Sequence, residues 1–282
     1  MMVGKLNYLL IKNMKNLNKI KKIGVIGSEG YVGKAQVLFW SSNDLYSVFR
    51  YDISFDSNSK EEINRCDLAV VCVPTLSKED GSCDISIVEE VISWLDVPVI
   101  IIKSTVPPGT IDMLIKKYHK RIVFSPEFIG ENKYWSPYEF HRDALKTPFI
   151  ILGGASKDRN YVYDLLLPIF GPFKTYKFMD AKSSEMVKYV SNCWGSMKVA
   201  WANEMKNICD ALEIDYGEVR EAWALDPKVE KSHTLVFKNN PGFGGKCLPK
   251  DTKALVKFAE IAGYDAELIK EVLSSNARFK RL

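Results

Sequence analysis

Residues 22–33 of the 282-residue chain read KIGVIGSEGYVG, and this stretch decides the fold. It begins as a short apolar run, turns at several glycines and continues into a segment whose apolar residues recur at helical spacing. That order is typical of the strand, turn and helix that open a dinucleotide-binding domain. Glycine permits the tight turn and lets a pyrophosphate lie against the N–H groups of the helix terminus.

The glycine pattern is imperfect, and a second feature supports it. Read as G-x-G-x-x-G ending at Gly33, the pattern has Ser28 in its first position, with Gly27 displaced by one. Asp52 ends the next predicted strand, 19 residues past Gly33, where a carboxylate would accept hydrogen bonds from an adenosine ribose. An acid there favours NAD over NADP, although Arg50 lies nearby. A glycine turn alone would also suit a protein that binds nothing, so the hypothesis of NAD binding rests on the combination.

Outward from this turn, short β-rich runs alternate with amphipathic stretches as far as residue 180. Strands are predicted at residues 22–27, 46–51, 68–73, 99–103, 121–124 and 149–152, and helices at residues 31–41, 85–95, 111–118 and 159–166. Most of the strands are continuous apolar runs, as expected where helices cover both faces of a parallel sheet. We therefore predict an α/β fold with a Rossmann-like, doubly wound, mostly parallel sheet over residues 20–180, preceded by an N-terminal extension at residues 1–19.

From residue 181 the pattern becomes helical. Residues 181–212 carry apolar side chains at helical spacing without a proline, which predicts one helix of about 45 Å. A helix of this length usually forms a spine or a subunit interface, so we expect a homodimer built on it. Shorter helices are predicted at residues 218–224, 252–261 and 267–276. Residues 181–282 are therefore predicted to form an all-α central or dimerisation domain with a long central helix.

The composition is that of a soluble globular protein, with 46% hydrophobic and 26% charged residues. No apolar run approaches the ~20 residues that cross a bilayer, so no membrane partner is expected. The small net charge of +4 gives no reason to expect nucleic acid. The six cysteines form no C-x-x-C pair, which fits reduced thiols in the cytoplasm. Paired ligand spacings are absent and there are three histidines, so no metal site is predicted.

Six segments occur in an informative order. They are GYVG at residues 30–33, VCVPT at 71–75, KSTVPPGT at 103–110, SPEF at 125–128, KYVSN at 188–192 and GFGGKCLPKD at 242–251. Together they resemble the UDP-glucose/GDP-mannose dehydrogenase family, in that family's order, over roughly residues 20–280. The resemblance implies an NAD-dependent enzyme that oxidises the primary alcohol of a nucleotide sugar to a carboxylate. The Gly-Phe-Gly-Gly form of the last segment favours UDP-glucose, with UDP-glucuronate as the product.

Cys247 stands in a sequence environment that suits a nucleophile better than a core residue. Taking an alcohol to an acid needs two hydride transfers, and a thiol that adds to the intermediate aldehyde keeps it from escaping. Gly244 and Gly245 let backbone approach a ligand closely, while Lys250 supplies a cation that favours the thiolate. The other five cysteines are interpreted as buried apolar residues.

The resemblance implies the roles of further residues. Lys188 and Asn192 stand four apart, so on a helix they share a face, and the family assigns such a pair to stabilising the alkoxide and the oxyanion. Asp251 and a glutamate are expected to position water. Without the resemblance, these polar residues would be interpreted as ordinary helix-surface and loop residues. The expected catalytic residues are Cys247, Lys188, Asn192, Asp251, Thr105, Glu131 and Glu127. Cofactor contacts are expected from Gly27, Gly30, Tyr31, Val32, Gly33, Asp52, Val73, Pro74, Thr75, Ser104, Thr105 and Glu131, and substrate contacts from Glu127, Phe128, Lys188, Asn192, Phe243, Gly244 and Gly245.

The chain departs from the family pattern in three places. Gly130 stands where relatives often have a basic residue, and Lys246 adds a positive charge directly before the nucleophile. The sequence stops at Leu282, whereas relatives continue into a third domain that closes over the nucleotide sugar. Remote binding often supplies energy that is used at the reacting centre, so its loss is expected to reduce turnover as well as affinity. A second chain that supplies the domain, or a smaller substrate, would relieve this loss.

Two alternatives stay open at this point. A two-domain β-hydroxyacid dehydrogenase has about this length and a similar Lys-x-x-x-Asn arrangement, but it performs one hydride transfer and needs no thiol. The other alternative is a truncated, weakly active or inactive NAD-binding homologue. The number of NADH formed per substrate distinguishes the first, and the absence of turnover with any nucleotide sugar distinguishes the second.

Overall fold

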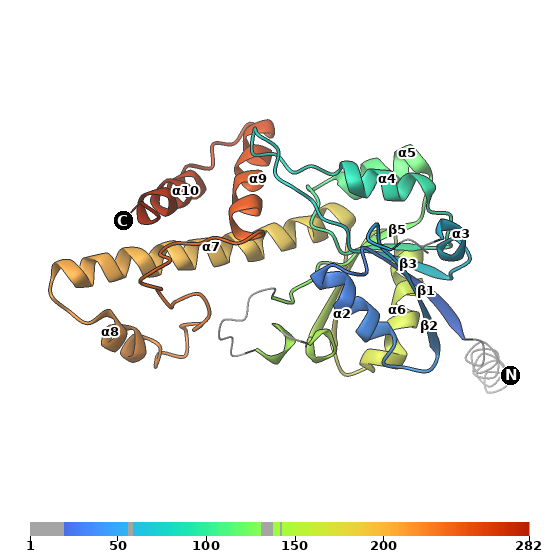
Figure 1. Ribbon diagram of the computed structural model, residues 1–282, viewed down its shortest axis with the longest axis horizontal. Coiled ribbons are helices and arrows are strands. Elements are labelled where there is room, and N and C mark those ends of the chain that lie inside the picture. The colour runs from blue at the N-terminus through green and yellow to red at the C-terminus, as the bar shows by residue number, and fades with distance from the viewer. Residues whose placement is uncertain (1–19, 56–58, 131–137, 142, 282) are drawn as a thin grey trace, which may run out of the picture.

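The computed structural model describes residues 20–55, 59–130, 138–141 and 143–281 (Figure 1). Its centre is a seven-stranded sheet in the order β2-β1-β3-β4-β5-β6-β7. The strands are β1 (Lys21–Ile26), β2 (Tyr46–Tyr51), β3 (Leu68–Val71), β4 (Ile100–Ile102), β5 (Ile122–Phe124), β6 (Phe149–Gly153) and β7 (Thr175–Met179). All neighbouring pairs run parallel except β5 and β6, which are antiparallel and joined through Phe124 and Gly153. The predicted fold class is confirmed.

Helices cover both faces of the sheet because its strands are apolar on both faces. On one face, α2 (Tyr31–Trp40) and α6 (Ser156–Phe170) pack on a cluster that contains Val70 and Ile101. On the other face, α4 (Ser86–Trp94) and α5 (Thr110–Tyr118) pack on a cluster that contains Val71 and Ile102. Consecutive residues of a strand thus pack into the hydrophobic clusters on opposite faces of the sheet, as the two-residue period of a strand requires.

The strand order places a switch point beside β1. Its neighbours are β2 on one side and β3 on the other, so the connections from β1 and β3 lead away in opposite directions. In doubly wound sheets, ligands bind in the crevice at the carboxyl ends of the strands at such a point. The glycine turn after β1 and the loops after β3, β4 and β5 all begin at this edge.

The second part of the chain is helical and is organised by α7 (Ala181–Ala211), which has 31 residues. Its first turn is capped by Asp180, whose side chain accepts a hydrogen bond from the Ser183 N–H at 2.8 Å. Figure 1 shows α7 extending away from the sheet, with α9 (Leu248–Ile261) and α10 (Glu267–Phe279) on one side and α8 (Tyr216–Trp223) near its far end.

Some elements differ from the sequence-based prediction. The predicted strand and helix at residues 149–152 and 159–166 are longer, and β7, the short helix α3 (Lys60–Ile63) and the 3-10 turns Glu139–His141 and Ala144–Lys146 were not predicted. The helix predicted from residue 252 begins at Leu248, because Pro249 fits the first turn of a helix. The extension at residues 1–19 lies outside the described residues.

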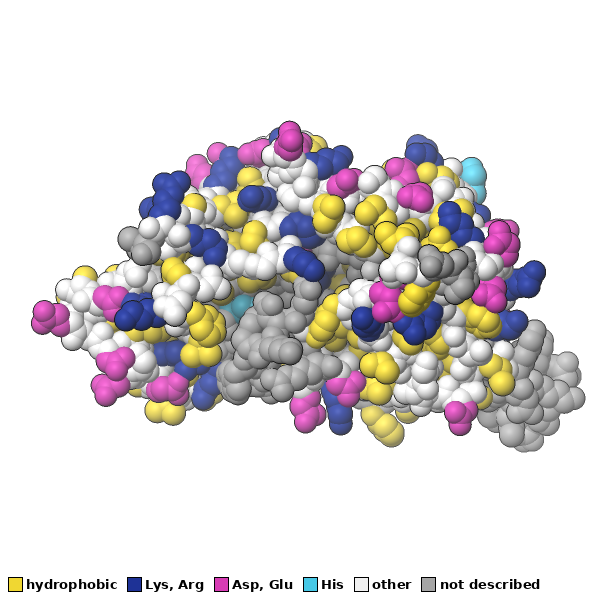
Figure 2. All heavy atoms as spheres, in the orientation of Figure 1, with side chains coloured by type: hydrophobic (Ala, Val, Ile, Leu, Met, Phe, Trp, Pro, Cys, Tyr) yellow, Lys and Arg dark blue, Asp and Glu magenta, His cyan; other side chains and the backbone are white. Residues whose placement is uncertain are grey.

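The surface in Figure 2 carries Lys and Arg side chains interspersed with Asp and Glu over the face that it shows. Within the described ranges, no helix combines the length and the apolar character that crossing a bilayer would take.

Candidate active site

The glycines of the β1–α2 turn let helix and strand approach closely. Gly27 has φ +76°, and a Cβ there would lie 2.8 Å from the carbonyl oxygen of Cys72. A Cβ on Gly33 would lie 1.9 Å from the carbonyl oxygen of Gly27, so only glycine fits this position. Gly30 is the N-cap of α2 and supplies no side-chain acceptor. The N–H groups of the first helical turn are therefore suited to an anion such as a pyrophosphate.

Asp52 lies directly after β2, beside the same turn. Its Oδ2 accepts from the backbone N–H of Glu29 at 3.0 Å, and its Oδ1 accepts from the N–H and the hydroxyl of Ser54 at 3.1 and 2.8 Å. Partial burial by itself would raise the pKa of Asp52, but these hydrogen bonds and the charge of Lys34 lower it overall. The Asp52 carboxylate is thus ionised and lies at the end of β2, where a dinucleotide presents its ribose hydroxyls in folds of this type. The glycine turn and Asp52 therefore fit such a cofactor.

The remaining residues expected to contact the cofactor lie along the same edge. Val73, Thr75 and Ser104 are buried, Tyr31 and Pro74 are exposed, and Val32 and Thr105 are half-buried. The Ser104 hydroxyl donates to the carbonyl of Val73 at 2.7 Å, which ties the loop after β4 to the loop after β3. Glu131 lies outside the described residues.

Cys247 lies at the N-cap of α9 and is exposed, whereas four of the other five cysteines are buried and Cys72 is half-buried. The positive end of a helix favours a negative charge such as a thiolate. The glycine-rich loop before it is fixed by two asparagines. Asn203 of α7 accepts from the Gly242 N–H at 2.9 Å, and Asn276 of α10 accepts from the Phe243 N–H at 2.6 Å.

Phe243, expected to contact substrate, has its side chain in the core of the helical part. It is 2% exposed and packs in a cluster with Ala200, Val272 and Phe279. Its ring therefore anchors the loop that carries Gly244, Gly245 and Cys247.

Lys188 and Asn192 converge on the start of α9 from α7. Burial lowers the pKa of Lys188, while the charges of Asp251, Cys247 and Glu127 act in the opposite direction. Asn192 donates from its Nδ2 to Oδ2 of Asp251 at 2.5 Å. Asp251 is itself 1% exposed, so its charge is compensated by these neighbours rather than by bulk water.

A chain of polar contacts connects Asp251 to the Rossmann loops. Lys250 forms an ion pair with Asp251, and its Nζ donates to Oγ1 of Thr75 at 3.4 Å. The Thr75 hydroxyl in turn donates to the carbonyl oxygen of Thr105 at 2.9 Å. The predicted residues Thr75, Thr105 and Asp251 therefore belong to one network across the two parts of the chain, with Lys250 as the bridge.

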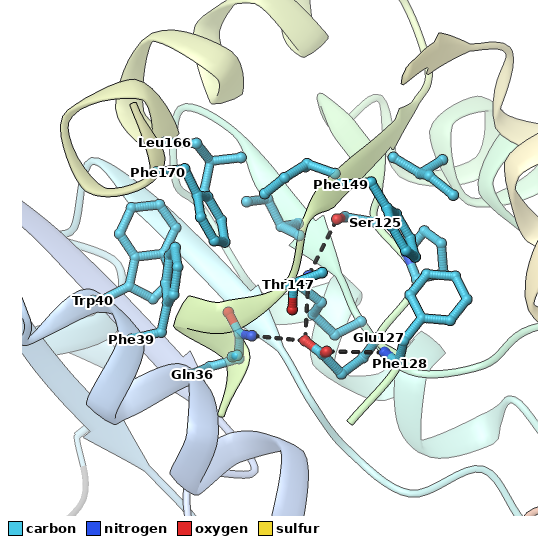
Figure 3. Close-up of a pocket in the computed structure, with 16 residues that line it drawn as sticks. Gln36, Phe39, Trp40, Ser125, Glu127, Phe128, Thr147, Phe149, Leu166 and Phe170 are labelled. Atoms are coloured by element: carbon cyan, nitrogen blue, oxygen red, sulfur yellow. Dashed lines mark hydrogen bonds and ion pairs between the residues drawn. The ribbon is translucent and has the colours of Figure 1, made fainter. Parts of the chain in front are cut away.

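Glu127 is held on all sides by donors (Figure 3). Its Oε1 accepts from the N–H groups of Phe128 and Ile129 at 2.9 and 3.3 Å. Its Oε2 accepts from Nε2 of Gln36 at 2.9 Å and lies 3.5 Å from Nζ of Lys103. Glu127, Phe128, Gln36 and Lys103 line a cavity whose other wall consists of the aromatic and aliphatic side chains of Phe39, Trp40, Leu166 and Phe170. Through its hydrogen bonds to the backbone N–H groups of Phe128 and Ile129, Glu127 orients the loop that carries Phe128.

Phe128 links this loop to α7. Its ring lies edge-on to Phe149 at 5.1 Å between centroids, and the ammonium of Lys188 lies 5.3 Å from its centroid. The SPEF segment therefore contacts the same lysine that faces Cys247.

Sequence reasoning missed two residues that support the site. Gln36 holds Glu127 from α2, and Glu185 of α7 accepts from the backbone N–H groups of Gly109 and Ile111 at 2.5 and 2.7 Å. Glu185 is fully buried and fixes the start of α5, in the segment that carries Thr105. The sequence offered one signal for Glu185, which is a glutamate on the apolar face of a predicted helix. A carboxylate that is buried there needs hydrogen-bond partners.

Two family models match the chain. The NAD binding domain of the UDP-glucose/GDP-mannose dehydrogenase family matches residues 45–173, and the central domain of that family matches residues 182–278. Among curated proteins, the chain is 30% identical over 239 residues to UDP-glucose 6-dehydrogenase of Rickettsia prowazekii, covering 79% of this chain and 52% of the relative. It is 29% identical over 247 residues to the UDP-glucose 6-dehydrogenase TuaD of Bacillus subtilis, covering 82% and 51%. The chain thus spans about half the length of these relatives.

Solved structures agree on the fold. A UDP-glucose dehydrogenase of Pyrobaculum islandicum superimposes with a TM-score of 0.77 at 24% identity, covering 92% of this chain and 68% of that structure. A UDP-D-ManNAc dehydrogenase of Pyrococcus horikoshii gives a TM-score of 0.71 at 24% identity with the same coverage. At this identity the superpositions establish architecture alone. The two family models, which lie side by side over most of the sequence, and the relative that is 30% identical show that the chain belongs to the UDP-glucose/GDP-mannose dehydrogenase family.

Proposed function

We propose that the chain is an NAD-dependent nucleotide-sugar dehydrogenase that oxidises the primary alcohol of UDP-glucose to the carboxylate of UDP-glucuronate. The convergence of Lys188, Asn192 and Asp251 at the start of α9, where Cys247 is exposed, carries this assignment. Two NAD⁺ molecules, bound in turn at the β1–α2 turn and Asp52, would supply the oxidising power, each accepting one hydride.

Lys188 and Asn192 are placed to donate hydrogen bonds to the oxygen on the reacting carbon. The hydroxyl gives up its proton to water, and the Lys188 ammonium and the Asn192 amide stabilise the negative charge that the oxygen then carries as the alcohol becomes an aldehyde. Donors that are already in place contribute on the order of 3 kcal/mol each to lowering such a barrier. The position of Lys188 between Phe128 and Asp251 keeps its ammonium fixed for this purpose.

Cys247 then holds the aldehyde. Its thiolate adds to the aldehyde carbon to form a C–S bond, and the carbonyl oxygen becomes an oxyanion that Lys188 and Asn192 stabilise. Loss of the second hydride from this thiohemiacetal leaves a thioester. Water, oriented by Asp251, attacks the thioester carbonyl, the C–S bond breaks, and Cys247 departs as the thiolate while the acid is released.

The test is NADH production by the purified chain with UDP-glucose, GDP-mannose and UDP-N-acetylmannosamine in parallel. We expect two NADH per UDP-glucose, and a loss of acid formation of at least about 100-fold in Cys247→Ser. Cys209→Ser, which changes a cysteine of α7 away from the Cys247 loop, serves as the control. Activity that appears only after a second polypeptide is added would place part of the nucleotide-binding surface on that chain.

Two outcomes would contradict the assignment. One NADH per substrate with activity retained in Cys247→Ser would indicate a β-hydroxyacid dehydrogenase instead. Binding of NAD⁺ without its reduction by any nucleotide sugar would indicate a non-catalytic homologue.

We also propose that the chain forms a homodimer in the cytoplasm. One face of α7, continued by its C-cap Leu212, exposes a stripe of apolar side chains at spacings of four and seven residues, namely Met186, Val190, Trp194, Trp201, Ile208 and Leu212. Trp194 and Trp201 are more than half exposed, which is costly for two of the largest apolar side chains unless a second surface covers them. The reactive thiol of Cys247 favours a reducing compartment.

A further inference from the structure

The turn between β1 and α2 contains a carboxylate that pairs with two cations. Glu29 forms an ion pair with the guanidinium of Arg50 on β2, and its Oε2 lies 3.2 Å from Nζ of Lys34 on α2. The Glu29 side chain is 28% exposed, less than those of Arg50 and Lys34, so the carboxylate is enclosed by the cations that it neutralises. The backbone N–H of Glu29 donates to Asp52, which places this cluster beside the carboxylate expected at the ribose.

Arg50 is held from a second side as well. Its guanidinium carbon lies 5.2 Å from the centroid of the Phe55 ring, in a cation–π contact. Guanidinium groups bind phosphates through two parallel hydrogen bonds, and an arginine near the end of β2 accommodates the 2′-phosphate of NADP in folds of this type. Here the guanidinium of Arg50 instead contacts the Phe55 ring and forms an ion pair with the Glu29 carboxylate.

We propose that Glu29, and not Asp52 alone, determines the preference of this chain for NAD over NADP. A phosphate on the ribose 2′-oxygen would meet two carboxylates, Asp52 and Glu29, while Arg50 and Lys34 already form ion pairs with Glu29. Like charges at this range repel and the paired cations give little compensation. The inference rests on the proposed function, because it assumes that this turn binds a nicotinamide dinucleotide.

The experiment measures dissociation constants of NAD⁺ and NADP⁺ by calorimetry for the full chain and for Glu29→Gln, which keeps the side-chain size and removes its charge. We expect the variant to shift the ratio of the two constants toward NADP⁺ by at least about tenfold, because Arg50 and Lys34 become available to the phosphate. The shift should diminish as salt rises, since the interaction is electrostatic. Glu90→Gln makes the same change of charge at an exposed position on α4 and should leave the ratio as it is.

Two further variants separate this role from a loss of structure. Glu29→Gln combined with Arg50→Met should shift the ratio less than Glu29→Gln alone, because the guanidinium that recruits the phosphate is gone while Lys34 remains. Arg50→Met alone should not weaken NADP⁺ binding, whereas it would do so if Arg50 bound the phosphate in the native chain.

Three outcomes separate the proposed function from the role of Glu29. A wild-type chain that binds neither dinucleotide would refute the proposed function. A chain that prefers NAD⁺ and keeps that preference in Glu29→Gln would overturn the role of Glu29 while leaving the proposed function in place. A wild-type chain that binds both dinucleotides equally would also overturn it.

Discussion

The ammonium of Lys188 is buried, and burial disfavours its charged form. Burial lowers the pKa of this ammonium, and Asp251, Cys247 and Glu127 supply the negative charge that opposes the shift. Because burial and the neighbouring negative charges shift the pKa of Lys188 in opposite directions, the loss of one neighbour would change this pKa. One pKa unit corresponds to about 1.4 kcal/mol. Its place beside the Phe128 ring also restricts where the ammonium can point.

Replacing Lys188 by Met should reduce kcat by at least about 100-fold, because the developing oxyanion loses its cation. The Michaelis constant for the nucleotide sugar should change much less, since the interaction matters most in the transition state. Steady-state kinetics check this. Lys182→Met changes an exposed lysine near the start of the same helix and should behave like the wild type. Equal losses in both variants would contradict a specific role for Lys188.

Gln36 is a positioning residue for Glu127. Gln36→Leu removes the donor to Oε2 of a carboxylate that is 8% exposed, so the free energy of unfolding should fall by about 1–3 kcal/mol. Urea denaturation measures this. Leu38→Ala, which shortens a largely exposed side chain of the same helix, should cost less than about 1 kcal/mol. A Gln36→Leu chain as stable as the wild type would show that Lys103 and the backbone donors suffice.

The sequence predicts site residues where spacing or motif brings them together, and it misses those joined by the fold alone. The four-residue spacing of Lys188 and Asn192 indicates a shared helix face, and the glycines around Cys247 indicate an exposed loop. Gln36 and Glu127 are 91 residues apart, and Lys250 and Thr75 are 175 apart. No periodicity relates such pairs, because their contact depends on where the sheet places α2 and on how α9 packs against α7.

At the scale of elements, the alternation of apolar runs and amphipathic stretches was sufficient to predict six of the strands in order. It failed for β7, whose side chains are mostly exposed or half-buried at the edge of the sheet. An edge strand buries too little to show a continuous apolar run, so it resembles a loop in sequence. It also failed for α3, which has four residues and is too short to show a helical period.

Glu185 makes the junction between α5 and α7 dependent on pH. Burial raises its pKa to about 7, against which the two backbone donors act only partly. The folded-state value lies above the unfolded one of about 4.5, so the folded chain binds more protons between these values. The contribution of Glu185 to stability is therefore fully present below pH 4.5 and is lost as the pH rises through 7.

Glu185→Gln should remove this dependence. Between pH 5 and 8 the wild type should lose up to about 3 kcal/mol of unfolding free energy from this group, and the variant should show a flatter profile over the same range. Denaturant titrations at several pH values measure both slopes. Glu204→Gln, an exposed position of the same helix, should keep the wild-type slope. Parallel profiles for Glu185→Gln and the wild type would disprove the assignment.

At the scale of the whole molecule, the apolar stripe of α7 predicts the state of assembly. Light scattering of the wild type at micromolar concentration should give twice the chain mass of 32.0 kDa. Trp201→Glu should give a monomer, because it places a charge at the centre of the stripe. Leu268→Glu alters an exposed leucine of α10 outside the stripe and should stay dimeric. A wild-type monomer would refute the dimer.

The length of α7 has a mechanical consequence. A rigid rod of about 45 Å amplifies rotation, so a tilt of about 5° at its first turn displaces its last turn by about 4 Å. Glu185 clamps the near end to α5, and Lys188 and Asn192 follow within two turns. A force that displaces the far end of α7 therefore also rotates the segment that carries Lys188 and Asn192. A partner surface that displaced Trp201 or Ile208, which lie toward the far end, would thus also rotate the side chains of Lys188 and Asn192.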